Sequence, residues 1–169
     1  MLNIKLLYTG IIISFLTAVT ASIGSTRPLM QCPRIDNPPI IDGKITDKCW
    51  QKATHITDFM NIKGDKLANE QTEVYTCYDS NKLYIAFKCF DSQIDKVQAT
   101  KTTRDADVWT DDCVDVFLDP DLSRRYFYQL IVNSIGTQQD INVNATNDTK
   151  WNIKWQSKSY KDQTNGAEE

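Results

Sequence analysis

The strongest constraint on the fold is a pair of β-rich runs, TEVYTCY and LYIAFKCF, which flank a turn signal at 79–82. Both runs repeat with a period of two, which is typical of strands. With Ser80 and Asn81 as the central pair of the turn, the register of a hairpin is fixed. This register predicts one apolar face made of three cross-strand pairs, namely Val74 with Phe87, Thr76 with Ile85, and Tyr78 with Leu83. It also places Cys77 and Cys89 on opposite faces, so we expect no disulfide between them.

The remaining sequence carries further short strand signals and almost no helical periodicity. One short helical turn within 45–53 is expected to bury Trp50 and Ala53, a polar loop covers 91–107, and a turn lies at 133–136. Further strands are expected within 108–120 (VWTDDCVDVFLDP), 126–133 (YFYQLIVN), 138–146 (QQDINVNAT) and 150–160 (KWNIKWQSKSY). Short strands at regular spacing predict an all-β fold, an antiparallel β-sandwich of the jelly-roll type.

The N-terminus has the features of a secretory signal peptide. Lys5 stands near the start, an apolar run covers 6–16, and small residues up to Ala21 suit a signal peptidase. A membrane anchor is the weaker alternative, because a spanning helix needs ~20 apolar residues. A lipoprotein linked through Cys32 is disfavoured, because Gln31 stands where a small residue is required.

These features predict three parts of the chain. They are a signal peptide (1–21), a tether (22–34) and a β-sandwich domain (35–169) that ends abruptly and is expected to be incomplete at its C-terminus. The mature protein is expected to be secreted, or to lie in the periplasm or at the cell surface, without membrane association after signal cleavage.

Charge and cysteine content narrow the function classes. Without the first 21 residues the chain has 18 basic and 22 acidic residues, a net charge of −4. Nucleic acid is therefore not an expected partner, because phosphate binding needs a basic face. The five cysteines are an odd number, so export permits disulfides but at least one thiol has no partner within the chain. The absence of CxxC spacing and the single histidine, His55, disfavour a zinc site.

A tryptophan close to acidic residues is the most informative candidate site. An indole covers the apolar C–H face of a sugar ring, a contact worth about 1–2 kcal/mol by analogy with other aromatic contacts. A carboxylate accepts hydroxyl protons through charge-assisted bonds. Trp109 and Asp115 are thus predicted to bind carbohydrate. The alternatives are core packing for Trp109 and a solvated strand face for Asp115. Trp151 and Trp155 form a further aromatic pair, for packing or for binding.

Four motifs in order, IDGKITDKCWQKA, YTCYDSNKLYIAFKCFD, VWTDDCVDVFLDP and YFYQLIVNSIGT, resemble the family 9 carbohydrate-binding modules over residues 39–155. The resemblance implies a β-sandwich related to DOMON domains that binds xylan- or cellulose-like polysaccharide beside a glycoside hydrolase in carbohydrate catabolism. Trp109 takes the place of the stacking tryptophan and Asp115 that of the strand carboxylate. Ile131 stands where sugar binders carry an arginine, and a second stacking tryptophan belongs beyond this sequence.

The resemblance also implies calcium, since several family members bind it. We expect a structural calcium ion at Asp91, Asp111 and Asp112, because calcium takes six to eight oxygen ligands and suits carboxylates gathered from loops.

Two other function classes remain as alternatives. In a hydrolase acting on O-glycosyl compounds, two carboxylates flank the scissile bond, but the acids of 111–115 lie too close in sequence to form such a pair. We therefore expect no catalytic residue here, and hydrolase activity only in an associated domain. A DOMON-like domain that does not bind sugar is the other alternative. Its haem would need axial ligands such as His55 and Met60, and no haem is expected.

Overall fold

The computed structural model describes residues 30–144 and 148–162, and these fold almost entirely as strands and loops. The strands are β1 (Thr54–Ile56), β2 (Thr72–Tyr78), β3 (Leu83–Cys89), β4 (Cys113–Leu118), β5 (Phe127–Asn133) and β6 (Gln138–Val143). The helical elements of the described residues are short 3-10 turns, η1 (Lys48–Lys52), η2 (Ile94–Lys96) and η3 (Val108–Thr110). The predicted all-β class is confirmed.

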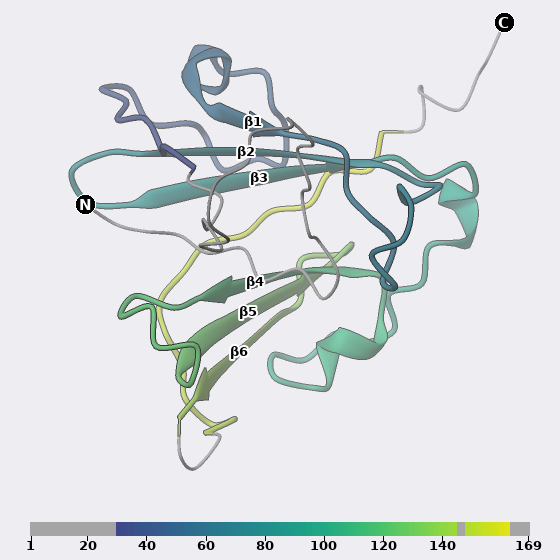
Figure 1. Ribbon diagram of the computed structural model, residues 1–169. Coiled ribbons are helices and arrows are strands. Elements are labelled where there is room, and N and C mark those ends of the chain that lie inside the picture. Colours follow the sequence, from purple (N-terminus) through teal and green to yellow (C-terminus); the bar gives the residue numbers. More distant parts are fainter. Residues whose placement is uncertain (1–29, 145–147, 163–169) are drawn as a thin grey trace, which may run out of the picture.

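The strands form two antiparallel sheets that lie one above the other (Figure 1). One sheet has the order β1-β2-β3 and the other β4-β5-β6, so neighbours in each sheet are consecutive in sequence. The connections between β2 and β3 (79–82) and between β5 and β6 (134–137) are short, and connections of this length join only antiparallel neighbours. The predicted antiparallel sandwich is confirmed.

The hairpin of β2 and β3 has the predicted register. Val74 pairs with Phe87, Thr76 with Ile85 and Tyr78 with Leu83. Asp79 holds the turn, because its Oδ1 accepts hydrogen bonds from the backbone N–H of Asn81 (2.7 Å) and of Lys82 (2.8 Å). Cys77 and Cys89 fall on opposite faces, as expected, and all the cysteines of the described residues are free thiols.

The segment that precedes β1 covers the face of the first sheet that is turned away from the second sheet (Figure 1). Its predicted helical turn is η1, which buries Trp50 to 7% exposure. The chain before it is fixed along β2, where Ile35 N–H donates to the Tyr78 carbonyl (2.8 Å). The resulting core cluster consists of Ile35, Cys49, Trp50, Cys77 and Tyr84. Trp50 and the partly buried Ala53 therefore pack in the core, as the sequence predicts.

The second sheet divides its side chains between two faces. Val114, Val116 and Leu118 of β4 share a face with Tyr128, Leu130 and Val132 of β5. Tyr126, the first residue of the predicted strand, precedes the first residue of β5. The opposite face carries Cys113, Asp115 and Phe117, and its β5 partners Asn133, Ile131 and Gln129. The turn after β5 closes through Gly136 N–H, which donates to the Asn133 carbonyl (2.9 Å).

The prediction of a strand at 150–160 is wrong. Residues 151–162 are irregular, and in Figure 1 they run from the second sheet toward the first. Their polar backbone groups pair with side chains instead of a strand ladder: the Ile153 N–H donates to Asp140 Oδ2 (2.7 Å), and Gln138 Nε2 donates to the Trp155 carbonyl (3.4 Å). The segment ends against Gly43, where Lys44 Nζ lies 4.9 Å from the Tyr160 ring centroid.

The expected signal peptide and most of the expected tether lie outside the described residues. Among the described residues, no helix has the length and apolar character needed to cross a membrane.

Candidate functional site

Trp109 lies exposed at the entrance to β4. It belongs to η3, which begins after Asp107 in the left-handed region (φ 44°). Val108 is fully buried and anchors the turn, while the next side chain, Trp109, is 61% exposed. Its indole Nε1 donates to Asp107 Oδ1 (3.4 Å), which holds one edge of the ring. The ring thus meets the first requirement of a stacking platform, an apolar face open to solvent.

Asp115 is the third residue of β4 and is half-buried. Its Oδ2 accepts a hydrogen bond from Gln129 Nε2 (2.7 Å), whereas its Oδ1 is buried with no hydrogen-bond partner in the described structure. Burial raises the pKa of Asp115 to about 6, an effect that the bond from Gln129 partly offsets. At neutral pH the side chain is therefore a carboxylate with one unused acceptor.

The neighbours of Asp115 across the sheet include glutamines that sequence reasoning missed. Asp115 pairs with Ile131, and Ile131 pairs with Gln139 on β6. Ile131, at the expected arginine position, is fully buried, and Gln139 is 5% exposed. Gln129, two residues before Ile131, contacts the carboxylate directly. The period-two pattern of β5 identifies Gln129, whereas Gln139 requires the register across the turn between β5 and β6.

Asp111 ties the loop before η3 to the second sheet. Its carboxylate accepts hydrogen bonds from Thr100 Oγ1 (2.8 Å), from the Lys101 N–H (2.8 Å) and from Asn133 Nδ2 (2.9 Å). Partial burial opposes ionisation, but these bonds hold the pKa of Asp111 well below its usual range. Asp112 has a similar role, since its Oδ2 accepts the Gln98 N–H (2.6 Å). Both acids therefore organise the loop.

Each of the expected calcium ligands accepts hydrogen bonds from its own neighbours. Asp91 Oδ1 accepts the Gln93 N–H (2.7 Å) in the turn after β3. Within 30–144 and 148–162, no group of three His, Cys, Asp or Glu side chains gathers at a site that could hold a metal ion. Asp91, Asp111 and Asp112 are thus not brought together by this arrangement, and calcium binding stays a prediction.

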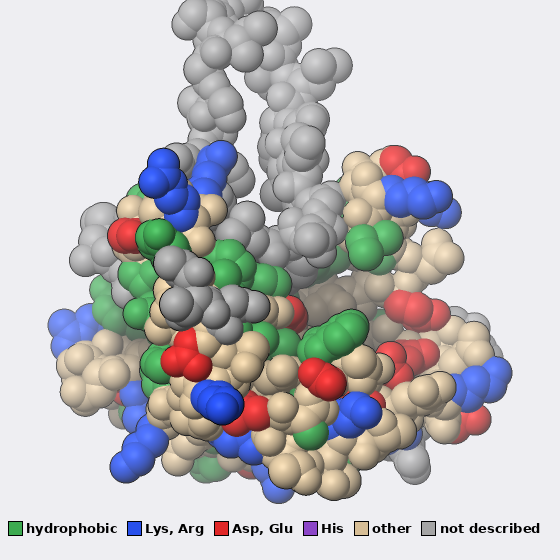
Figure 2. All heavy atoms as spheres, turned by 90° about the horizontal axis from the view of Figure 1, so that it is seen from below, with side chains coloured by type: hydrophobic (Ala, Val, Ile, Leu, Met, Phe, Trp, Pro, Cys, Tyr) green, Lys and Arg blue, Asp and Glu red, His purple; other side chains and the backbone are tan. Residues whose placement is uncertain are grey.

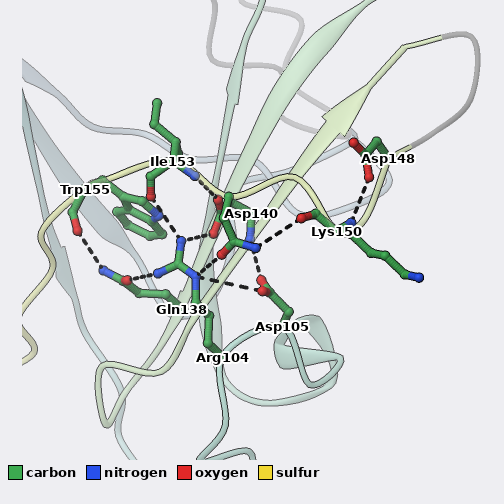
Figure 3. Close-up of polar contacts among 9 residues, drawn as sticks. Arg104, Asp105, Gln138, Asp140, Asp148, Lys150, Ile153 and Trp155 are labelled. Carbon is green, nitrogen blue, oxygen red and sulfur yellow. Dashed lines mark hydrogen bonds and ion pairs between the residues drawn. The ribbon is translucent and has the colours of Figure 1, made fainter.

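A further polar cluster surrounds Arg104 (Figure 3). Its guanidinium forms an ion pair with the fully buried Asp140 and hydrogen bonds with Gln138 and Asn152 (Nε to Oδ1, 2.6 Å). A further bond reaches the Ile153 carbonyl (3.2 Å). These contacts attach the C-terminal segment to β6. Because the acceptors around the guanidinium belong to the protein itself, we assign the cluster a structural role.

The other aromatic candidates pack against neighbours. Trp151 stacks on Tyr128 with ring centroids 4.9 Å apart, and Trp155 is partly buried with its Nε1 enclosed. His55 lies on β1, where it stacks on Tyr75 (4.4 Å between centroids) and approaches Glu73 (3.4 Å). These contacts favour the packing alternative for the tryptophan pair and leave Trp109 as the exposed indole of the described residues.

Comparison with known protein families matches residues 41–167 to the family described as carbohydrate family 9 binding domain-like. Searches of curated proteins and of solved structures gave no match. The matched region includes both sheets, Trp109 and Asp115, and confirms the resemblance inferred from the four motifs. The chain belongs to the carbohydrate family 9 binding domain-like family.

Proposed function

We propose that this protein is a secreted, non-catalytic carbohydrate-binding module that attaches to polysaccharide through Trp109 and Asp115. Membership of the family supports carbohydrate binding in general. The observation that carries the assignment to these residues is the 61% exposed indole, six residues before a carboxylate with an unused acceptor. Sugar rings need both an apolar platform and strong hydroxyl acceptors.

The surface agrees with a hydroxyl-rich ligand. Seen from below in Figure 2, acidic and basic side chains are interspersed, and a shaded hollow opens beside several acidic side chains. The same face carries apolar side chains, and a sugar has both hydroxyls and apolar C–H groups that such a mixed surface can contact. A single stacking ring and one charged acceptor contribute only a few kcal/mol beyond the cost of association, so we expect Kd values from about 1 μM to about 1 mM.

Several finer features belong to the same proposal. The ligand is a xylan- or cellulose-like polysaccharide or oligosaccharide, and the module acts with a glycoside hydrolase that supplies the catalysis. Asp115 is the one carboxylate on its face of β4, so a flanking pair of acids for glycoside hydrolysis is not provided by this strand. Export to the cell exterior or periplasm and a structural calcium ion complete the proposal.

Isothermal titration calorimetry with xylohexaose and cellohexaose tests whether the protein binds carbohydrate through Trp109. We expect binding by the wild type and about 5- to 30-fold weaker binding by Trp109→Ala, the equivalent of losing ~1–2 kcal/mol of stacking. Tyr126→Ala is the matched control. This ring is also exposed (47%), but it lies just before β5, near the end of β4 that is remote from Trp109. Equal affinity of Trp109→Ala and the wild type, or no heat with any oligosaccharide, would contradict the proposal.

A further inference from the structure

Two buried cysteines belong to the core cluster that holds the N-terminal segment against the first sheet. Cys49 lies on η1 and is 8% exposed, whereas Cys77 lies on β2 and is fully buried. Both side chains pack in this cluster with Trp50, and both are free thiols in the structure. Folding therefore gathers two thiols that are remote in sequence into one part of the core.

The electrostatic effects within this cluster indicate that the two thiols are neighbours. The pKa of Cys77 is raised to about 12, by burial first and then by the nearby thiols of Cys49 and Cys32. Burial and a hydrogen bond to a carboxylate raise the pKa of Tyr84 to about 12, and the thiols of Cys77 and Cys49 add to this effect. Ionisable groups influence one another in this way only when they are close together. Cys49 and Cys77 are thus close both to each other and to Tyr84.

The other cysteines, all of which the structure describes, are not placed to bond with Cys77. The Cys32 thiol forms a hydrogen bond with Thr76, whose side chain projects to the face of β2 opposite Cys77. Cys89 of β3 also projects to the face opposite Cys77, and Cys113 belongs to the second sheet. The cysteine of η1 is therefore the partner that the fold offers.

We propose that Cys49 and Cys77 form a disulfide bond when the protein folds in an oxidising compartment, and that this bond attaches the N-terminal segment covalently to the first sheet. Disulfides persist in such compartments and strengthen small exported domains. The bond would settle the odd cysteine count as one pair and three single thiols. It does not depend on the proposed carbohydrate binding.

The oxidant is a small-molecule disulfide such as oxidised glutathione. One cysteine thiolate attacks the S–S bond of this donor, which releases one glutathione thiolate and leaves a mixed disulfide on the protein. The second cysteine thiolate attacks the protein sulfur of the mixed disulfide and releases the other glutathione thiolate. The two cysteines lose two protons and two electrons, and the donor is reduced to two thiols.

Burial determines when this bond forms. The thiolate is the attacking species, and burial raises the pKa of both Cys77 and Cys49. The folded, reduced protein should therefore react slowly with the oxidant, because both thiols stay protonated and covered. The bond should form during refolding, before η1 packs on β2, and the packed core should then protect it from reductants.

The test is a peptide map of the protein refolded from denaturant with reduced and oxidised glutathione, then alkylated and digested with trypsin. Lys48 and Lys52 flank Cys49, and the five cysteines fall in five different tryptic peptides. We expect peptide 49–52 to be linked to peptide 67–82, which contains Cys77, and three cysteines to stay free for alkylation. Five alkylated cysteines, or a bond between any other pair, would overturn the proposal.

Thermal unfolding tests whether the bond attaches the segment. The Tm of the wild type refolded with oxidised glutathione should exceed that of the reduced wild type by about 5–15 °C. Cys113→Ser, at an exposed cysteine, is the matched control and should keep this difference, whereas Cys49→Ala should lose it. Each variant is compared with its own reduced form, so the effect of alanine on the core cancels.

The remaining outcomes are decisive as well. An equal gain in Tm for Cys49→Ala and the wild type would overturn the proposal, because the gain would then come from another bond. A linked peptide without any gain in Tm would overturn the attachment of the segment. If Cys49→Ala does not fold, the peptide map of the wild type decides the pairing. Failure of carbohydrate binding leaves this inference untouched, since no measurement here uses a sugar.

Discussion

At the scale of single residues, the burial of Asp115 is the feature with most consequences. The carboxylate keeps one bond, from Gln129, and loses solvent around Oδ1. Burial raises its pKa from 3.8 to about 6. The folded state therefore binds more protons than the unfolded state between about pH 4 and pH 6. The contribution of this group to the free energy of unfolding falls as the pH rises through that window and stays low above it.

Asp115→Asn should reveal this penalty. The amide keeps the size of the side chain but carries no charge, so the variant should have a higher Tm than the wild type at about pH 7.5 and nearly the same Tm at about pH 4. Thermal unfolding followed by circular dichroism at both pH values measures the difference. A Tm difference that is the same at both pH values would show that the buried charge is not its cause.

At the scale of elements, the irregular C-terminal segment (151–162) is attached by two different kinds of contact. The first is electrostatic, since Arg104 joins the buried Asp140 of β6 to the carbonyl of Ile153. The second is steric, since the segment approaches Gly43 so closely that a Cβ there would lie 2.8 Å from the Ser159 carbonyl carbon. Each of these contacts predicts a loss of stability when it is removed by mutation.

Arg104→Leu should destabilise the protein by about 3–5 kcal/mol, because it leaves the carboxylate of Asp140 buried without its counter-ion. Urea unfolding measures the loss. Arg125→Leu is the control, because Arg125 is exposed and should change stability by less than about 0.5 kcal/mol. Similar losses for the two variants would mean that the Arg104 cluster does not hold the segment.

Gly43→Ala should cost more stability than Gly136→Ala. Both glycines have positive φ angles, 86° and 88°, so alanine meets the same backbone strain of about 1–2 kcal/mol at each position. Only at Gly43 would the new methyl group also collide with the backbone of Ser159 and Tyr160, whereas nothing lies within 4 Å at Gly136. Urea unfolding measures the free energy of unfolding of both variants. Equal losses would show that the steric contact at Gly43 does not contribute to stability.

At the scale of the whole molecule, the sequence predicts what depends on local pattern. The Val74–Phe87 register follows from a two-residue turn, and the exposure of Trp109 agrees with its place between acids before a strand. A strand was expected at 150–160 because Trp151, Ile153 and Trp155 alternate like strand residues, and this prediction is wrong. Their backbone groups instead meet Arg104, Gln138 and Asp140, which are distant in sequence. The place of Gln139 beside Ile131 was missed for the same reason, since it depends on the pairing of β5 with β6.

The central claim is that sugar stacks on the indole of Trp109, and NMR observation of tryptophan side chains tests it most directly. The chain has four tryptophans, so four indole N–H signals are expected, and Trp109→Phe identifies one of them. On addition of xylohexaose or cellohexaose, the Trp109 signal should shift, while those of the packed Trp50, Trp151 and Trp155 stay in place. An unmoved Trp109 signal at saturating oligosaccharide, or shifts confined to the other three, would contradict the account.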